Sequence, residues 1–320
     1  MGSDARRPIW LDTDPGFDDW WAWTLLQTHP AFELLGVSIV SGNAPLTRTL
    51  DNACRIRDWH GWPTPLWAGA DRPLVQSVVT AQDVLGDQGL ASVGATLPPA
   101  THGPRAGDAV GALIAAARAR PGELTLVAIG PLTNVALAMA RAPELPSLLR
   151  QIVVMGGSVD RGNTTAVAEF NIHADPEAAA QVLGAARDLA QQPLHLFGLN
   201  VCRQVLVGPE HVHGLRALGT ERAHTFADHL QAYVAIAHRR GGTHMAVYDP
   251  TPVAWLLDPG AFDFEPAQVA VELQGTLTRG MTVCEFRVPA RAAPNTQVAM
   301  RADGPRVMRT LMEGLHACLR

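Results

Sequence analysis

Four aspartates gather near the start of the chain, where a predicted buried strand gives way to a predicted helix. The segment reads Ile9-Trp-Leu-Asp12-Thr-Asp14-Pro-Gly-Phe-Asp18-Asp19. The apolar run predicts a strand, Pro-Gly predicts a tight turn, and the last two aspartates fall in the first turn of the helix. Carboxylates this close repel one another unless a cation or hydrogen-bond donors offset their charge. We therefore expect a hard divalent cation at this strand end.

The ligand type narrows the choice of ion. Oxygen ligands without thiolates or paired histidines favour Ca²⁺ or Mg²⁺ over zinc, and a carboxylate-rich set favours Ca²⁺. In a simpler interpretation, Asp18 and Asp19 only complement the helix dipole and Asp12 only caps the turn. Capping occupies one or two carboxylates rather than four, so the metal interpretation is favoured.

A second chemistry fits part of the same segment. The spacing of Asp12-Thr-Asp14 is that of the paired aspartates in haloacid-dehalogenase-like phosphotransferases, whose first aspartate is a nucleophile. The following residues, 15–19, have no role in that family. A phosphotransferase is therefore the weaker alternative.

Composition indicates a folded protein with a small-molecule partner. The chain has 320 residues, 47% of them apolar, and a formal net charge of −5, so it can fill a sizeable core and has no basic field for nucleic acid. Neither a secretory signal nor a membrane-spanning run is recognisable. Its four cysteines lie far apart without CxxC spacing, which argues against a zinc site or a disulfide framework and predicts a reduced, cytoplasmic protein.

Short apolar runs alternate with amphipathic stretches, which predicts an α/β fold with an open, mostly parallel (mixed) sheet and helices on both faces. We expect one domain over residues 1–320. The predicted strands are Pro8–Asp12, Leu34–Ser41, Leu124–Ile129, Gln151–Met155 and Leu194–Leu199. The predicted helices are Asp18–Thr28, Thr47–Trp59, Asp108–Arg120, Asn134–Arg141 and Pro176–Leu183.

The second half of the chain is predicted to hold two more helices. Glu221–Arg240 has a helical pattern that Gly241-Gly242 would end, and another helix begins at Asp249-Pro250. The segment Gly241–Ala246 is a candidate mobile loop. In open sheets of this class, ligands bind beyond the carboxyl ends of the strands, where the polar residues of this sequence fall.

The aspartate segment resembles the opening of the inosine-uridine preferring nucleoside hydrolase family, and the resemblance continues through most of the chain. Each motif alone is weak, but their order and spacing together are specific. Beyond residues 12–19 they are Ser41-Gly42-Asn43, Gly130-Pro131-Leu132-Thr133-Asn134, Met155-Gly156-Gly157, Glu169-Phe170-Asn171 and Asp249-Pro250.

The resemblance implies a calcium-dependent nucleoside hydrolase. Asp14, Asp19 and Asp249, with the backbone carbonyl of Ile129, would hold Ca²⁺, which would also bind the 2′- and 3′-hydroxyls of ribose and a water. Asp14 would act as general base on that water. Attack at the anomeric carbon would pass through an oxocarbenium-like transition state that the anionic site stabilises.

The resemblance also implies a set of sugar contacts. Asn43 would orient the water and the ribose, Asp18 and Asn171 would bind ribose hydroxyls, Asn163 and Glu169 would hold the 5′-hydroxyl, and Met155 would pack against the sugar. Structural alternatives stay open, since an Asn after a strand often only forms a turn and a Met on a buried strand is usually core. Asn134 is better explained as a helix cap than as a ligand.

The chain departs from the family where the leaving base is activated. Many members carry His directly before the second metal aspartate, where this chain has Tyr248, and pyrimidine-preferring relatives carry another His where this chain has Leu85. Tyrosine is a weak acid, with a pKa near 10. Purine-preferring relatives instead sandwich the base between aromatic rings, which Tyr248 could do. The partner ring would be Trp67 or one of Trp20, Trp21 and Trp23, although helical spacing makes those three core residues.

Basic residues near the end of the long helix, His238, Arg239, Arg240 and His244, either contact substrate or are solvated side chains at a helix terminus. We predict a cytoplasmic ribonucleoside hydrolase that prefers purine nucleosides and forms a homodimer or homotetramer. It would bind neither nucleic acid nor membrane. The non-enzymatic alternative is a protein that binds nucleoside or ribose without turnover, against which the intact Asp14 argues.

Overall fold

A nine-stranded sheet forms the centre of the fold in the computed structural model, which describes residues 6–186, 189, 194–287 and 293–320. The strand order is β10-β9-β11-β6-β5-β4-β1-β2-β3. Pairings from β11 to β3 are parallel, while β9 runs antiparallel to both β11 and β10. The strands are β1 (Arg7–Thr13), β2 (Phe32–Ile39), β3 (Leu66–Ala68), β4 (Thr125–Ala128), β5 (Gln151–Met155), β6 (Leu194–Phe197), β9 (Phe262–Val271), β10 (Thr282–Glu285) and β11 (Thr296–Ala302).

The strand order fixes where a ligand can bind. From β3 to β6 the order is 3-2-1-4-5-6, the doubly wound arrangement in which the chain direction across the sheet reverses between β1 and β4. Connections leave β1 and β4 toward opposite sides at this point, so a crevice opens beyond their carboxyl ends. The aspartate segment follows β1 directly.

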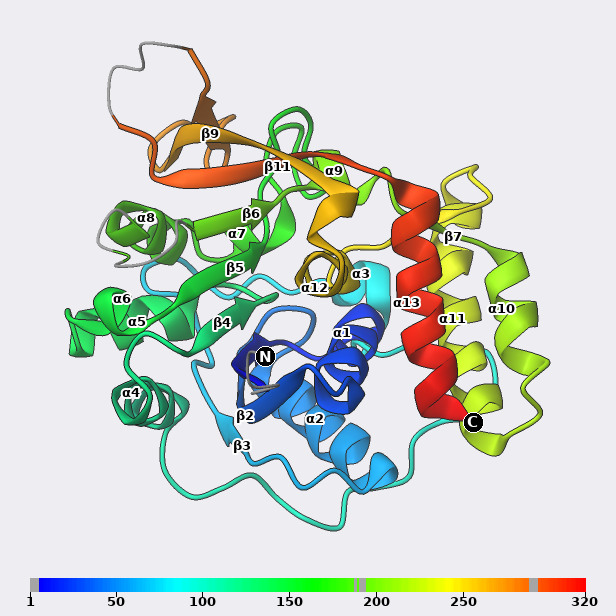
Figure 1. Ribbon diagram of the computed structural model, residues 1–320. Helices are drawn as coiled ribbons and strands as arrows, with labels where there is room; N and C mark the ends of the chain where they lie inside the picture. The colour runs from blue at the N-terminus through cyan, green and yellow to red at the C-terminus, as the bar shows by residue number, and fades with distance from the viewer. Residues whose placement is uncertain (1–5, 187–188, 190–193, 288–292) are drawn as a thin grey trace, which may run out of the picture.

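Helices cover both faces of the sheet (Figure 1). One face carries α1 (Phe17–Thr28), α2 (Leu46–His60), α12 (Pro250–Leu257) and α13 (Gly304–Leu319), and the other carries α4 (Ala109–Ala119), α5 (Thr133–Arg141), α6 (Leu145–Leu148) and α8 (Pro176–Ala185). Strand residues alternate between the two cores: Ile9 and Leu11 pack on the α1 side, and Trp10 between them packs on the α4 side.

A smaller unit lies beyond the α1 face. Strands β7 (Leu206–Val207) and β8 (Met245–Ala246) pair antiparallel, and α10 (Pro209–Arg216) packs against α11 (Glu221–Arg239). The short helices α3 (Gln82–Leu85), α7 (Phe170–Ala174) and α9 (Leu199–Cys202) and the 3-10 turn η2 (Pro259–Ala261) complete the described elements.

The predicted fold class is confirmed, and every predicted strand and helix overlaps an observed one. One boundary was wrong: the predicted loop Gly241–Ala246 ends earlier, because Met245 and Ala246 form the buried strand β8. The prediction that the three tryptophans of α1 are core residues is also confirmed. Trp20, Trp21 and Trp23 are fully buried in the core, so they do not face a ligand.

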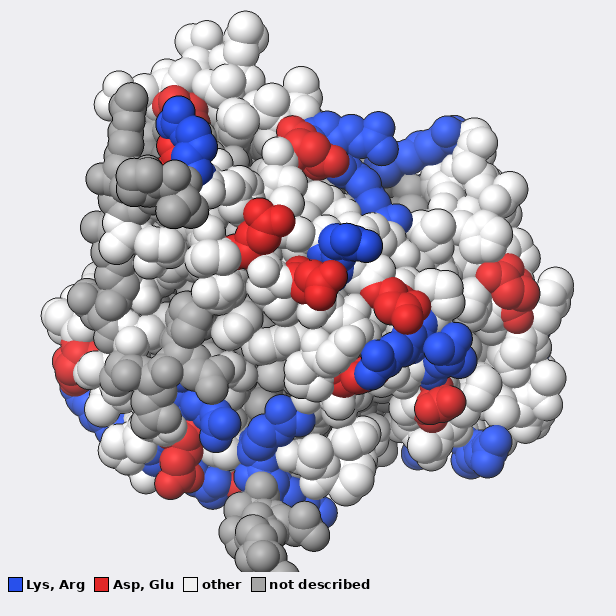
Figure 2. Space-filling model, turned by 45° about the horizontal axis from the view of Figure 1, so that its top comes forward, with Lys and Arg blue, Asp and Glu red and all other residues white. Residues whose placement is uncertain are grey.

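The surface carries no large field of one sign on the face shown in Figure 2, where acidic and basic side chains are interspersed. Every positively charged side chain there is arginine, since the sequence contains no lysine. Within the described residues, no helix is both long and apolar enough to cross a membrane. All four cysteines are unpaired.

Candidate active site

A pocket of about 120 Å³ opens at the reversal point of the sheet. Its polar floor comes from residues that end or follow β1, β2, β4 and β5, as expected for this topology. Ten of the eleven predicted site residues line it, and the eleventh, Asp19, lies behind Asp14 and Asn43. The ten are Asp14, Asp18, Asn43, Ile129, Met155, Asn163, Glu169, Asn171, Tyr248 and Asp249.

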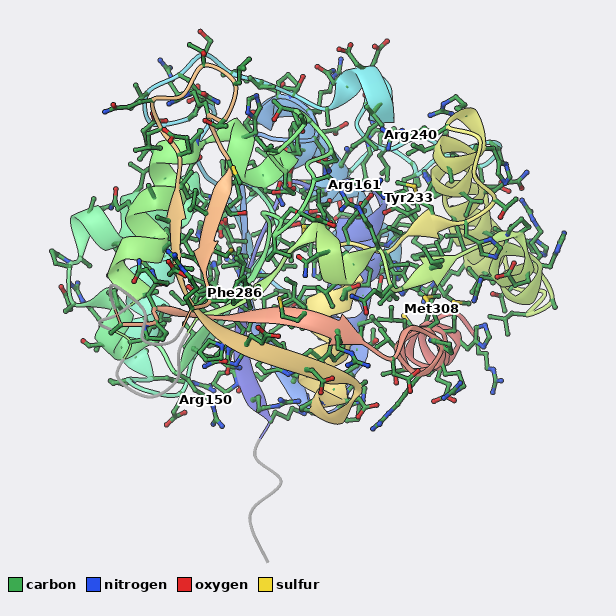
Figure 3. The ribbon with its side chains drawn as sticks, turned by 90° about the horizontal axis from the view of Figure 1, so that it is seen from above. Arg150, Arg161, Tyr233, Arg240, Phe286 and Met308 are labelled. Carbon is green, nitrogen blue, oxygen red and sulfur yellow. The ribbon has the colours of Figure 1, made fainter. Side chains whose placement is uncertain are left out.

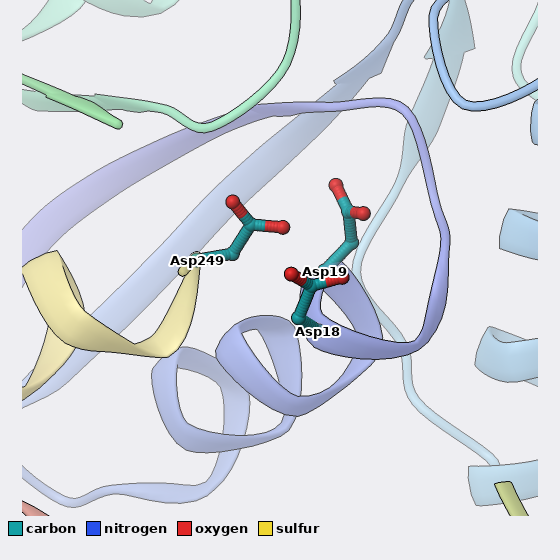
Figure 4. Close-up of side chains that lie close together, drawn as sticks. All are labelled: Asp18, Asp19 and Asp249. Carbon is teal, nitrogen blue, oxygen red and sulfur yellow. The ribbon is translucent and has the colours of Figure 1, made fainter. Parts of the chain in front are cut away.

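Three carboxylates from two distant segments meet at the bottom of the pocket. Asp18 and Asp19 begin α1, and Asp249 precedes α12 (Figure 4). One ligand atom from each lies within 4.8 Å of the others, and all three side chains are buried. In the part of the chain that the structure describes, this is the only group of acidic, His or Cys side chains so placed.

Asp19 is held by donors from the turn before it. Its Oδ1 accepts from the Thr13 hydroxyl at 2.5 Å, and its Oδ2 accepts from the Gly16 amide and from Asn43 Nδ2, both at 2.9 Å. These bonds fix the carboxylate against the Pro15-Gly16 turn. Asn43 is therefore more than a turn former, because its side chain also donates to the Asp14 carbonyl at 3.0 Å.

The Asp14 carboxylate fits between two glycines. Oδ2 accepts from the Asn43 amide at 2.6 Å. A Cβ on Gly42 would lie 2.1 Å from Asp14 Oδ2, and one on Gly130 would lie 2.6 Å from Asp14 Oδ1. Neither glycine has a positive φ, so these positions exclude larger residues because of the carboxylate and not because of backbone strain.

Asp12 does not join the other aspartates, contrary to the prediction that all four crowd together. Side chains alternate between the two faces of β1, so Asp12 lies on the same face as Trp10 and opposite to Ile9 and Leu11. It does not line the pocket. Its carboxylate accepts from Ser38 and, at 2.8 Å, from Asn134 Nδ2. A nucleophilic role for Asp12, as in the phosphotransferase alternative, does not fit this position.

Asn134 is not a helix cap, which corrects a second prediction. The N-cap of α5 is Leu132. The Asn134 amide donates to Asp12, and its Oδ1 accepts from the Ala70 amide at 2.8 Å. The side chain thus ties α5 to the ends of β1 and β3, behind the pocket floor.

Burial and mutual repulsion disfavour the charged forms of the pocket carboxyls. Burial, with the nearby Asp19 charge second, raises the pKa of Asp18 to about 7 and that of Asp14 well above its usual range. Burial and then Asp18 raise the pKa of Asp249 in the same way. Burial also raises the pKa of Asp19. These groups can all ionise together only if positive charge enters the pocket.

The donor set fits a hard divalent cation. Ligands on opposite sides of a Ca²⁺ ion are about 5 Å apart, comparable to the spread of the three carboxylates. All the charged donors are carboxylate oxygens, and the buried residues Asp14 and Ile129 line the same pocket. The Ile129 carbonyl accepts from Asn171 Nδ2 at 2.8 Å, and a carbonyl oxygen retains a second lone pair for an ion.

The wall next to the carboxylates is polar and suits a sugar. Glu169 caps α7, accepting from the amides of Gly157, Asn171 and Ile172, and burial raises its pKa to about 7. Asn171 Nδ2 donates to the carbonyls of Ile129 and Met155, which leaves its Oδ1 as an acceptor. Asn163 stands at the exposed rim.

The opposite wall is apolar and aromatic. Leu85 of α3 and Tyr248 before α12 line it, as predicted, although burial raises the pKa of Tyr248 to about 12 and so weakens it further as an acid. In the described lining no residue is histidine. Trp67 does not reach the pocket; it stacks on Trp10 with ring centroids 5.3 Å apart.

Two residues of α11, together with Arg240 directly after its end, complete this wall, and sequence reasoning missed the two helix residues. Tyr233, Ile236 and Arg240 line the pocket; Figure 3 labels the first and last of these. Their spacing of three and four residues places them on one helix face. The Tyr233 hydroxyl lies 3.1 Å from Asp18 Oδ2 and 2.8 Å from the Ala246 carbonyl, and its single proton can be donated to either oxygen. Of the basic residues considered in the sequence, only Arg240 lines the pocket, whereas His244 lies beside Glu210.

Comparison with known proteins identifies the family. The model of the inosine-uridine preferring nucleoside hydrolase family matches residues 9–309. A pyrimidine-specific ribonucleoside hydrolase, RihA, from Shewanella woodyi is 40% identical over 87% of this chain and 88% of its own length. The non-specific ribonucleoside hydrolase RihC of Escherichia coli is 36% identical over 93% of this chain and 94% of its own length.

Solved structures agree with the sequence relatives. A purine-preferring ribonucleoside hydrolase from Gardnerella vaginalis superposes with a TM-score of 0.90 at 27% identity, covering 98% of this chain and 99% of its own. The chain belongs to the inosine-uridine preferring nucleoside hydrolase family. It is therefore classed with the N-glycosyl hydrolases of ribonucleosides.

The crowded carboxyls predict a pH-dependent response to calcium. Asp18, with a pKa raised from 3.8 to about 7, binds its proton more tightly when folded, so ionising it near neutral pH destabilises the ion-free protein. A bound cation offsets this loss of stability because it favours the ionised carboxylates. We expect the rise in melting temperature on replacing chelator with Ca²⁺ to be larger at about pH 7.5 than at about pH 5. An equal rise at both pH values would contradict a carboxylate cation site.

Substitution of Gly42 should damage the site without damaging the fold. In Gly42→Ala, the new methyl group would displace the Asp14 carboxylate, and we expect kcat for nucleoside hydrolysis to fall about 100-fold. The control is Gly184→Ala on α8, where an added Cβ meets nothing within 4 Å and activity should be unchanged. Similar losses in both variants would show that Gly42 has no special relation to catalysis.

Proposed function

We propose that this protein hydrolyses the N-glycosidic bond of ribonucleosides to ribose and free base, requires Ca²⁺, and prefers purine nucleosides. The observation that carries the proposal is the set of four buried carboxylates, Asp14, Asp18, Asp19 and Asp249, at the sheet's reversal point. They adjoin one polar wall suited to a sugar and one apolar wall suited to a base.

The metal-ligand set is the one that the family resemblance implies. It is supported by the clustering of Asp19 and Asp249 with Asp18 and by the presence of Asp14 and Ile129 in the lining of the adjoining pocket. Asp14, Asp19, Asp249 and the Ile129 carbonyl would hold Ca²⁺, which when bound supplies the charge that keeps the carboxylates ionised, anchors the ribose 2′- and 3′-hydroxyls and acidifies a water. Asp14 takes the proton of the attacking water, and the Asn43 amide keeps the carboxylate oriented for this transfer.

The remaining side chains position the sugar. Asp18, with one oxygen held by the Tyr233 hydroxyl, and the free Oδ1 of Asn171 accept hydrogen bonds from ribose hydroxyls. Glu169 and Asn163 bind the 5′-hydroxyl, and Met155 contacts the ring. As the glycosidic bond lengthens, positive charge develops on the sugar, and the anionic floor of the pocket stabilises it.

The base is held on the apolar wall without a general acid from histidine. Tyr248 and Tyr233, the only two tyrosines of the chain, both line the pocket, but burial raises both pKa values, so neither is a good proton donor. Stacking on Tyr248 raises the affinity of a purine ring for a proton from water. This argument supports a purine preference.

The relatives differ in the base named for them, since RihA from Shewanella woodyi is pyrimidine-specific and the Gardnerella vaginalis enzyme is purine-preferring. Our preference for purines therefore rests on Tyr248, which stands where many members of the family carry a histidine, and on Leu85, which stands where pyrimidine-preferring relatives carry another. A binding protein without turnover is the remaining alternative. We also expect a homodimer or homotetramer in the cytoplasm, consistent with the family resemblance and the unpaired cysteines.

The direct test is release of ribose from inosine, adenosine, guanosine, uridine and cytidine, with Ca²⁺ or with chelator. We expect chelator-sensitive release that is fastest with the purine nucleosides, and a loss of kcat of at least about 1,000-fold in Asp14→Asn, which lacks the base. Ribose binding without release from any nucleoside would instead identify a binding protein. If ribose were released fastest from uridine, the proposed hydrolysis would be supported and the proposed purine preference would be contradicted.

The role of Tyr248 can be tested by two variants. If its ring stacks on the base, Tyr248→Phe should keep kcat for inosine within about threefold, whereas Tyr248→Ala should lower kcat/KM about tenfold or more. If its hydroxyl donates the proton, Tyr248→Phe should itself lower kcat by about 100-fold. The second pattern would contradict the stacking role.

A further inference from the structure

The loop between β5 and α7 carries part of the sugar wall. Asn163 and Thr164, near its middle, both line the pocket and are both exposed. The Asn163 Oδ1 accepts a 3.3 Å hydrogen bond from the Thr164 hydroxyl. This contact is with its own neighbour in the chain, so the place of the Asn163 side chain at the rim depends on how the backbone of the loop is held.

Hydrogen bonds fix the two ends of this loop. At its start, the Thr282 hydroxyl accepts from the Ser158 amide at 2.9 Å and donates to the Ser158 carbonyl at 2.6 Å. Toward its end, the amides of Asn163 and Thr164 both donate to the Ala168 carbonyl at 3.2 Å. The stretch between these anchors is at least partly exposed, so packing alone would hold it weakly.

Arg203 holds this exposed stretch from a different part of the chain. Its Nη1 donates to Asp160 Oδ1 at 2.9 Å, and its Nη2 donates to the carbonyls of Arg161 and Gly162 at 2.8 and 3.2 Å. Figure 3 labels Arg161, the middle residue of the three. An exposed ion pair alone adds little to stability, but here one guanidinium bonds three consecutive residues directly before Asn163.

The arginine itself stands on a well-anchored segment. Arg203 directly follows α9, which comes after the central strand β6. Asn200 Nδ2 donates to the Ala299 carbonyl of β11, and Gln204 Nε2 donates to the Met300 carbonyl of the same strand, both at 2.9 Å. Residues on both sides of Arg203 are thus bonded to the sheet, so the guanidinium ties the loop to the strands that carry the catalytic floor.

The contact depends on the shape of the guanidinium as well as on its charge. Two nitrogens of one planar group reach the three acceptors, whereas the ammonium group of lysine is a single nitrogen on a flexible stem. The substitution Arg203→Lys therefore retains the positive charge beside the pocket and loses the fixed geometry. Charge and geometry can be separated by experiment for this reason.

We propose that Arg203 is a positioning residue for recognition of the 5′-hydroxyl: it fixes the loop that presents Asn163 and so sets how strongly the enzyme prefers a ribonucleoside over its 5′-deoxy analogue. The inference rests on the proposed function, in which Asn163 and Glu169 bind this hydroxyl. Glu169 is buried and accepts from three backbone amides, so its position does not depend on Arg203. Loss of Arg203 weakens one of the two contacts.

The test measures kcat/KM for adenosine, uridine and the 5′-deoxy analogue of each by release of the base. We expect the unmodified protein to prefer the parent nucleoside about 100-fold or more. Arg203→Ala should lower kcat/KM for the parent nucleoside about tenfold and leave the 5′-deoxy analogue within about twofold. Arg203→Lys should show most of the same selective loss. A disturbed fold or an altered charge would lower both values alike.

Two further variants control this comparison. Arg306 also bonds one carboxylate and one carbonyl, those of Asp258 and Gly260, but does not line the pocket, so Arg306→Ala should change neither substrate. If Arg203 acts through Asn163, then Arg203→Ala should have no additional effect on the 5′-hydroxyl preference in a protein that already carries Asn163→Ala.

The outcomes separate this inference from the proposed function. Equal losses of both substrates in Arg203→Ala, or no loss at all, would overturn the positioning role and leave hydrolysis standing. An unchanged preference in Arg203→Lys, or fully additive losses in the double variant, would equally overturn it, because the arginine would then act through its charge or apart from Asn163. If the unmodified protein hydrolysed no nucleoside, the proposed function would fail and this inference with it.

Discussion

Repulsion among buried carboxylates is the constraint on which the rest of the site depends. Asp14, Asp18, Asp19 and Asp249 are each at most 8% exposed, and burial together with their neighbours' charges raises the pKa of Asp14, Asp18 and Asp249. Such an arrangement is stable near neutral pH only with a cation or with retained protons. The same imbalance suits the pocket to a transition state that is positively charged on the sugar.

The backbone around these groups is arranged to keep them in place. Asn43 bonds both Asp14 and Asp19, and Gly42 and Gly130 leave room for the Asp14 carboxylate. Behind them, the Asn134 side chain bonds both the Asp12 carboxylate and the Ala70 amide. These bonds connect the ends of β1 and β3. Residues that never meet the substrate therefore determine where the water-activating carboxylate lies.

Much of this could be predicted from the sequence, and the failures have physical causes. Buried apolar runs predicted the strands, and amphipathic stretches with their end signals predicted the helices. Polar residues at the strand ends predicted the pocket, because the carboxyl ends of parallel strands lie at one edge of the sheet. Asp12 was misplaced because proximity in sequence was given more weight than the alternation of a strand, which puts it on the face of Trp10. Tyr233 and Ile236 were missed because helical periodicity alone cannot distinguish a core face from a pocket-lining one. Strands β7 and β8 are too short to leave a pattern.

The two walls of the pocket belong to different kinds of structure. The sugar wall comes from residues at the ends of central strands and the helix starts beside them, whereas the base wall comes from α3, α11 and the residues around β8, outside the main sheet. Tyr233 and Ile236 of the base wall are buried in the hydrophobic core, but Val84 is exposed and Leu85 is only partly buried on the short helix α3, so these two positions can change with less disturbance of the core than the strand ends of the sugar wall. Mutation can therefore explore new bases while the bond-breaking apparatus is preserved, so within this scaffold substrate choice can evolve faster than chemistry.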